Sequence, residues 1–257
     1  MPTQANPPEL IISLSRDKVR LQLLAQPDSG RASWESVFSV YNTFLEDQVS
    51  LALDAALAQN PSLMDDLGNV EVLVIDRPNI CVPQYYMGNG MLQGIAGRYL
   101  RLRAGDTLTT DFTSGDAVIA YTIPTDTINV LREYYARIGQ LHLTSVLWTA
   151  INMKEDTVSK DSAGLFFYPL GNTLIVLGET GGKLTFSKIF YIQDQSDLAY
   201  YAVACNRLLK PKDNWLVQVG DEPLTFEMPR LSHFAVDRRL NLPSLHSLIA
   251  SHRSCAS

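Results

Sequence analysis

The segment Gly164–Gly220 constrains the fold of this chain more than any other part of its sequence. Three runs rich in β-branched and aromatic residues, separated by turn residues, predict strands at Gly164–Tyr168, Asn172–Leu177 and Lys183–Gln193. A helical pattern follows these strands, and a fourth apolar run, Trp215–Val219, follows the helix. A strand that returns after a helical crossover lies parallel to its starting strand. The segment therefore predicts a three-strand meander, a helix and a returning strand in one sheet.

Capping residues and spacing predict where the helix of this segment lies. We expect Asp194 at the N-cap, with Asp197 adding negative charge to the first turn. Pro211 cannot continue the helix, which should therefore end near Lys210. Apolar residues recur at three and four residues along one stripe: Leu198, Tyr201, Ala202, Cys205, Leu208 and Leu209. On that stripe Cys205 is expected to be a small buried side chain and not a nucleophile.

The same order of elements is predicted near the start of the chain. Strands are expected at Leu10–Leu14, Val19–Leu24 and Trp34–Tyr41, a helix from an N-cap at Thr43 to Asn60-Pro61, and a buried strand at Val70–Ile75. The two halves share this order with negligible sequence identity. The recurrence predicts an α/β fold with mixed sheets, made of two lobes that each contain a three-strand meander plus a helix and a strand.

The remaining segments divide the chain into a short start and two lobes. Residues 1–9 are proline-rich and expected to be disordered, and the polar stretch Met153–Ala163 is the expected junction, which gives lobes at 10–153 and 154–257. Further helical segments are predicted at Gln84–Met87, Met91–Tyr99, Thr125–Gly139, Ser145–Met153 and after Leu242-Pro243. Further strands are predicted at Thr107–Thr113, Ala117–Ile123, Leu141–Leu143, Leu224–Glu227 and Ser232–Val236.

Composition excludes several classes of partner and site. The net charge is −6, and no Lys/Arg cluster is present, which argues against a nucleic-acid partner. The chain has neither a signal-peptide pattern nor an apolar run of the ~18 residues that a membrane span needs, so we expect a cytoplasmic protein. Three widely separated cysteines (Cys81, Cys205 and Cys255) indicate reduced thiols. The four histidines lack metal-ligand spacing, so no metal site is expected.

Three groups of residues resemble a known superfamily. They are Gly182–Phe190 followed by Ser196–Tyr201, the run Ile119–Pro124, and Cys81-Val82-Pro83. On these residues the chain resembles the duplicated core of the actin-like ATPases, a ribonuclease H-like fold. More specifically, it resembles a bacterial family of unknown function with that fold, and it is distantly similar to the cytoplasmic actin-like proteins of type IV pilus and type II secretion platforms.

The resemblance implies where a nucleotide site would lie. Superfamily members hold phosphates on two hairpin turns, where glycine allows close approach of backbone N–H groups and aspartate positions a metal ion. Here the first turn, Ser13–Lys18, has no glycine, and the second, Tyr168–Thr173, has no acid near its first position and contains a proline. A glycine-rich turn against adenosine is reduced to Gly220-Asp221. The cleft candidates are therefore Ser15, Asp17, Gly171, Asn172, Gly220 and Asp221.

Other glycine-rich segments favour structural explanations. Gly178–Gly182 lacks the Lys-Ser/Thr of a phosphate loop and precedes a strand, so a hairpin at Glu179–Gly182 is predicted. The segment with Gly88, Gly90, Gly94 and Gly97 is interpreted as a loop that weakens the nearby helix. These glycines add no second candidate for a phosphate site.

The leading hypothesis from the sequence is a catalytically silent protein of actin-like fold, without cofactor, that binds a protein partner as a scaffold. The alternative is an ATP-dependent phosphotransferase or ATPase with a diverged site, in which Asp17 or Asp221 lies near the metal ion. A third idea is a homodimer formed through an exposed sheet edge. Titration with Mg-ATP separates the first two, and the size of the protein in solution tests the third.

Overall fold

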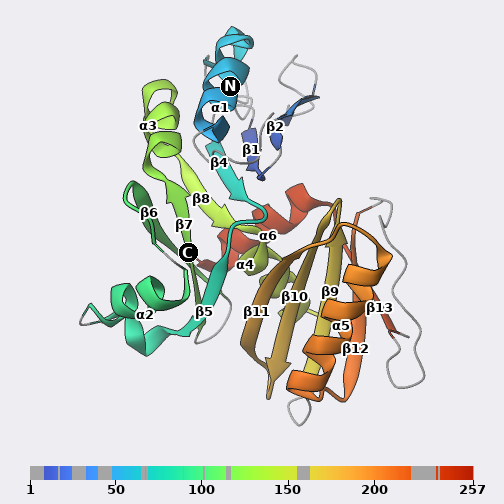
Figure 1. Cartoon of the computed structure of the whole chain (residues 1–257). Coiled ribbons are helices and arrows are strands. Elements are labelled where there is room, and N and C mark those ends of the chain that lie inside the picture. Colours follow the sequence, from blue (N-terminus) through green and yellow to red (C-terminus); the bar gives the residue numbers. More distant parts are fainter. Residues whose placement is uncertain are drawn as a thin grey trace, which may run out of the picture. The chain divides into compact units, whose positions relative to one another are not determined.

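A computed structural model describes two compact units (Figure 1). The first contains residues 1–77, 102–109 and 122–143, and the second contains residues 78–101, 110–121 and 144–257. The structure describes residues 9–16, 18–24, 33–39, 48–64, 67, 69–88, 90–100, 102–113, 117–154, 163–220, 236 and 238–256.

The first unit is built on a five-stranded mixed sheet with the order β3-β2-β1-β4-β8. Its strands are β1 (Glu9–Leu14), β2 (Lys18–Leu24), β3 (Trp34–Ser39), β4 (Asn69–Val74) and β8 (Gly139–His142). β2 pairs antiparallel with both β1 and β3, while β4 runs parallel to both β1 and β8. The carboxyl ends of the parallel strands β1 and β4 therefore meet at one edge, which is where an α/β sheet carries its ligand sites.

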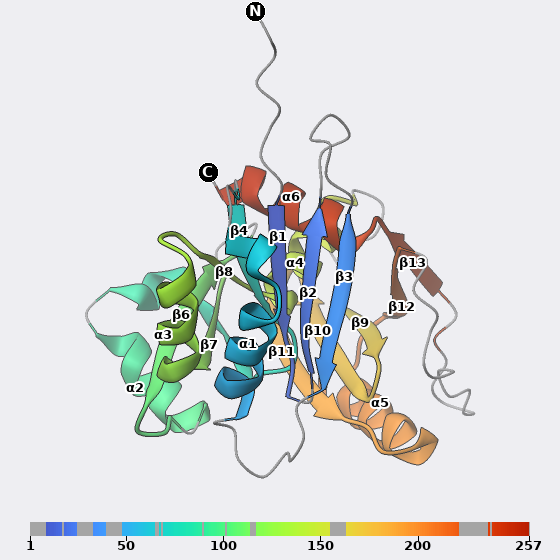
Figure 2. The same ribbon diagram turned by 90° about the horizontal axis from the view of Figure 1, so that it is seen from above.

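Helices α1 (Gln48–Ala58) and α3 (Thr125–Tyr134) pack against each other and cover one face of this sheet (Figure 2). In β2, buried residues alternate with partly exposed ones, as expected for a strand with one covered face. The buried cluster beneath the helices contains Leu10, Ile12, Leu21, Leu53, Val72 and Leu131. Each fully buried aliphatic side chain contributes about 1.5–3 kcal/mol relative to exposure. A short 3₁₀ helix, η1 (Pro61–Met64), follows α1.

The second unit repeats the same strand order in a separate sheet, β11-β10-β9-β12-β13. Its strands are β9 (Ala163–Leu170), β10 (Thr173–Thr180), β11 (Lys183–Tyr191), β12 (Asp213–Val219) and β13 (Arg238–Leu242). β12 runs parallel to β9, which confirms the predicted return into the same sheet. The shared order confirms the element recurrence that the sequence predicted.

Helix α5 (Gln195–Leu209) joins β11 to β12 and begins and ends where its sequence predicts. The Asp194 carboxylate accepts hydrogen bonds from the N–H groups of Ser196 (2.7 Å) and Asp197 (3.0 Å), and the helix ends before Lys210, whose φ is +46°. Cys205 is buried with Leu198 and Ala202 in the cluster between α5 and the sheet, which confirms its predicted structural role.

The second unit also holds a smaller part formed by β5 (Asn79–Pro83), η2 (Gln84–Met87) and α2 (Met91–Tyr99). β5 joins a three-stranded sheet, β5-β7-β6, with β7 (Ala117–Pro124) and β6 (Asp106–Phe112). The Ser187 hydroxyl of β11 donates to Asn79 Oδ1 (2.6 Å), and the Cys81 thiol donates to the Leu184 carbonyl (3.2 Å). These bonds fasten β5 to β11. Helices α4 (Leu143–Asn152) and α6 (Leu245–Ala256) complete the described elements.

The structure corrects three predictions about elements. Strands β5 and β13 had not been predicted, and α3 ends at Tyr134 instead of continuing to Gly139. Gly139 begins β8 opposite Glu71 and does not end a helix, and a side chain there would displace the Glu71 carboxyl group. The predicted strand Leu224–Glu227, residues 232–235 of the predicted strand Ser232–Val236, and the N-cap at Thr43 lie outside the described residues, while Val236 is described and does not lie in a strand.

Candidate functional site

The predicted first phosphate turn joins β1 to β2 in the first unit. Leu14, the last residue of β1, lies beside Val74, the last residue of β4, and the Ile75 N–H donates to the Leu14 carbonyl (2.9 Å). This register continues the pairing one residue beyond the strands. It brings the chain after β4 directly to the turn that holds Ser15.

The described donors of this turn are all used within the protein. The Ser15 N–H donates to the Lys18 carbonyl (2.9 Å), and the Lys18 N–H donates to the Ser15 hydroxyl (3.1 Å). The Arg16 N–H points at the Asp76 carboxylate, with both oxygens 3.0 Å from the nitrogen. Asp76 is only 3% exposed. An internal carboxylate thus takes the backbone donor that an anionic ligand would need.

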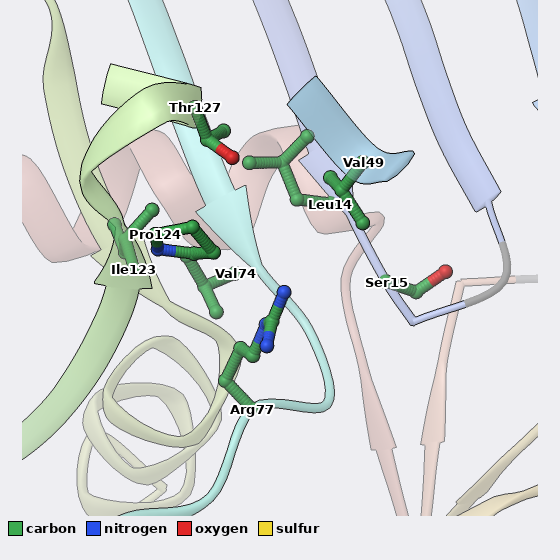
Figure 3. Close-up of a pocket in the computed structure, with 8 residues that line it drawn as sticks. All are labelled: Leu14, Ser15, Val49, Val74, Arg77, Ile123, Pro124 and Thr127. Carbon is green, nitrogen blue, oxygen red and sulfur yellow. The ribbon is translucent and has the colours of Figure 1, made fainter. Parts of the chain in front are cut away.

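A small pocket lies beside this turn within the first unit (Figure 3). The cavity volume open to the centres of water molecules is about 10 Å³. This is room for about one water molecule and not for a phosphoryl group. The Arg77 side chain reaches toward the pocket, and the buried Thr127 hydroxyl, which makes no hydrogen bond to any residue that the structure describes, points toward Leu14. The lining residues are Leu14, Ser15, Val49, Val74, Arg77, Ile123, Pro124 and Thr127.

The predicted second phosphate turn joins β9 to β10 in the second unit. Leu170 pairs with Thr173, so only Gly171 and Asn172 form the connection, and Gly171 takes a φ of +56° that favours glycine. The Asn172 carbonyl accepts from the Ile192 N–H (2.7 Å). Both turn residues are exposed. This tight turn is the shortest common hairpin connection and leaves little backbone to wrap a phosphate.

Gly220, the remnant of the adenosine turn, follows β12 in the second unit. Because β12 runs parallel to β9, Gly220 and Gly171 both follow carboxyl ends at the same edge of this sheet. The Gly220 N–H donates to the Leu242 carbonyl (3.0 Å), and a Cβ at Gly220 would lie 3.4 Å from the Ser244 Cα. The glycine therefore accommodates the chain after β13. Of the six candidates, Asp17 and Asp221 lie outside the described residues.

A buried polar cluster in the second unit was not predicted from the sequence. Asp111 of β6 lies 3.0 Å from His252 Nε2 of α6, and His252 Nδ1 lies 2.9 Å from the Thr149 hydroxyl of α4. The Ser145 hydroxyl donates to the second oxygen of Asp111. All four residues are at most 6% exposed. The order of acid, histidine and hydroxyl is that of a hydrolase triad, but burial denies it a substrate, so the cluster joins β6, α4 and α6.

Other reactive groups in the described part of the chain do not form a site. Burial raises the pKa of the Cys81 and Cys205 thiols to about 11, so both stay protonated near neutral pH and are poor nucleophiles. The described residues contain no group of three or more His, Cys, Asp or Glu side chains arranged to hold a metal ion. None of the described helices combines the length and the apolar character that crossing a membrane requires.

The likeness to solved structures defines the class of the protein. The chain is similar to a Bacteroides thetaiotaomicron protein with an actin-like ATPase fold and unknown function, with a TM-score of 0.70 and 15% identity over 85% of this chain and 84% of that chain. The chain therefore has an actin-like ATPase fold, as the sequence predicted.

The family follows from the sequence match. Residues 1–212 match the family described as protein of unknown function (DUF3822), and the chain belongs to this family. This confirms the resemblance to an unknown-function family of actin-like fold. A comparison with curated proteins gave no match.

Two further structures show weaker likeness. One is the inorganic polyphosphate/ATP-glucomannokinase from Arthrobacter sp. strain KM, with a TM-score of 0.47 and 11% identity over 98% of this chain and 99% of that chain. The other is the PilM-PilN type IV pilus biogenesis complex, with a TM-score of 0.40 and 12% identity over 77% of this chain and 66% of that chain. The distant similarity to a pilus protein stated above is thus found among solved structures.

Proposed function

We propose that this protein is a catalytically silent member of the actin-like superfamily that acts by binding a protein partner. The hydrogen bond from the Arg16 N–H to the Asp76 carboxylate carries the first part of this proposal. This carboxylate occupies the backbone N–H that an incoming phosphate would need as a donor. The function that remains for such a scaffold is recognition.

Three further observations support a silent site. The pocket beside Ser15 has room for about one water molecule. The Gly171-Asn172 turn offers two residues where an anion site needs several convergent N–H groups. The Gly220 N–H is already bonded to Leu242. We further propose that the lobes extend over residues 10–153 and 154–257 and that the protein acts in the cytoplasm.

Isothermal titration calorimetry with Mg-ATP tests the silent site. The full chain should give no binding heat up to about 1 mM nucleotide, which corresponds to less than about 4 kcal/mol of binding free energy. It should also release no phosphate from ATP above the rate of the buffer. Micromolar binding by the wild-type chain contradicts the proposal.

The alternative function is an ATP-dependent phosphotransferase or ATPase whose metal ion lies near Asp17 or Asp221. It is favoured only by the fold class. If micromolar binding is seen, the Asp17→Ala and Asp221→Ala variants decide between a specific site and a surface effect, with Asp126→Ala, an acid of the first turn of α3, as the control. Loss of binding in one of the first two, but not in the control, establishes the alternative.

A further inference from the structure

The surface of η2 and α2 in the second unit exposes large apolar side chains. Tyr85 is 73% exposed, Met91 is 53% exposed and Tyr99 is 71% exposed. The helix is held from its other side, where Ala96 is fully buried. Exposed aromatic and methionine side chains are enriched at protein-binding surfaces.

The exposed side of α2 also has an open path for a neighbouring chain. Met91, Gly94 and Arg98 are spaced by three and four residues, so they share one side of the helix. A Cβ at Gly94 would meet no atom within 4 Å, so no contact inside the protein requires a glycine there. Glycine weakens the interior of a helix relative to alanine. The residue therefore suits a surface that another backbone approaches closely.

The charge of this part of the chain is opposite to that of the whole protein. Residues 78–101 of the second unit contain no Asp or Glu, while Arg98 and Arg101 occur there, in a chain of net charge −6. Arg98 lies in the last turn of α2, is exposed, and forms no ion pair with any residue that the structure describes. An exposed arginine on an element that also exposes aromatic side chains complements a segment that is both acidic and apolar.

We propose that Tyr85, Met91, Gly94, Arg98 and Tyr99, here termed the η2–α2 face, dock an acidic segment of another protein that also carries apolar side chains. The inference rests on the proposed binding function and names its surface and the chemistry of its partner. Carboxylates of the segment pair with Arg98, and its apolar side chains pack on Tyr85, Met91 and Tyr99. Its backbone passes close to α2 at Gly94.

Fluorescence anisotropy with defined peptides tests this docking on the full chain. The first labelled probe alternates Glu with Leu and Phe, a second replaces Glu with Lys, and a third replaces Leu and Phe with Ser. The first probe should bind, and the other two should bind at least ~10-fold more weakly, because both charge and apolar area contribute. Equal binding of the first two probes would overturn the proposal.

Matched variants locate the binding surface. Arg98→Glu and Tyr99→Ser should each weaken binding of the acidic probe ~10-fold or more, as expected for a central contact. Arg207→Glu and Tyr200→Ser change an exposed arginine and an exposed tyrosine on α5 of the same unit, and they should leave binding unchanged. If the α5 variants weaken binding and the α2 variants do not, the η2–α2 face is refuted while a partner-binding role stands.

Gly94→Ala separates a loss of fold from a loss of docking. Alanine should raise the Tm by about 2 °C, since it favours the helix and meets no neighbour. It should nevertheless weaken binding of the acidic probe, because its methyl group prevents close approach. A more stable variant with unchanged affinity would contradict the passage of a backbone at Gly94.

Two other occupants are checked with the same variants. If light scattering shows a dimer that Arg98→Glu dissociates, the face binds a second copy and the proposed partner is wrong. If the chain sediments with vesicles containing phosphatidylserine and Arg98→Glu abolishes this, the face binds a membrane and the proposal also fails. The nucleotide titration is independent of all these results, so failure of the docking surface and failure of the silent site remain distinguishable.

Discussion

The two sheets share one strand order, but their first hairpin turns differ in length and in what satisfies their backbone. Four residues separate the last pair of β1 and β2, Leu14 and Val19, and the Arg16 N–H of this turn is bonded to Asp76. Two residues separate Leu170 and Thr173 in the other sheet, and the positive φ of Gly171 closes that turn. Topology therefore fixes where the turns lie, while loop length and one distant side chain decide how the backbone N–H groups of the turns are bonded.

A second buried carboxylate also accepts a hydrogen bond from the backbone N–H of a turn. Glu179, 2% exposed near the end of β10, accepts a hydrogen bond from the Gly182 N–H (2.8 Å) in the turn before β11. Gly181 and Gly182 both have positive φ, as a two-residue hairpin of this kind requires. Buried carboxylates thus accept hydrogen bonds from turn N–H groups in both units, from Arg16 in the first and from Gly182 in the second.

Removal of Asp76 should have the largest effect on stability, because it takes away the acceptor that distinguishes the first turn from the second. Asp76→Ala leaves the Arg16 N–H without its charged acceptor, and the free energy of unfolding should fall by about 2–3 kcal/mol. Urea denaturation followed by circular dichroism measures this loss. Asp76→Asn keeps an acceptor oxygen and should lose less. Equal losses for the two variants would show that charge, and not the hydrogen bond, stabilises the turn.

A substitution at Gly171 in the second turn should have an intermediate effect on stability. Gly171→Ala places a side chain on a backbone with φ of +56° and should cost about 1 kcal/mol, although no atom lies within 4 Å of the new Cβ. Gly88→Ala is the control, since Gly88 has equal space but a φ of −75°. The same denaturation experiment compares them. A similar cost at both positions would refute the role of backbone strain.

The contribution of Glu179 to the pH dependence of stability should be the smallest of the three effects. Desolvation raises the pKa of this carboxyl group above its ordinary value of 4.5, although the Gly182 N–H opposes the shift. The folded state therefore binds the proton more tightly than the unfolded state, so this group favours folding most below pH 4.5 and loses that contribution as the pH rises through the folded pKa. Glu179→Gln should gain stability relative to the wild type as the pH rises from 4 to 7. A loss of stability of Glu179→Gln relative to the wild type over this pH range would contradict the raised pKa.

The order of elements was predictable because its signals are local. Runs of β-branched and aromatic residues marked the strands, Asp194 and Pro211 marked the ends of α5, and Gly181-Gly182 marked a hairpin, all within a few residues of the feature they define. Strand β5 was missed because it ends at Pro83, directly before a predicted helical segment, and β13 was missed because it begins with two arginines.

The chemistry of the turns was only partly predictable. The lack of glycine in the Ser15 turn and the tight connection at Gly171 could be recognised in the sequence. The Arg16–Asp76 bond joins residues 60 apart and the Asp111–His252 contact joins residues 141 apart, and no linear pattern records such pairs. Whether the six candidate residues contact a nucleotide stays a prediction for the titration.

The position of His252 has a consequence for how this chain is handled. The family match ends at residue 212, yet α6, which carries His252 to the buried Asp111, lies entirely beyond that limit. A shortened chain that stops at the family boundary would leave an acid in the interior without its histidine and would lack β12 and β13 as well. The unit that must be expressed for stable folding is therefore longer than the region by which the family is recognised.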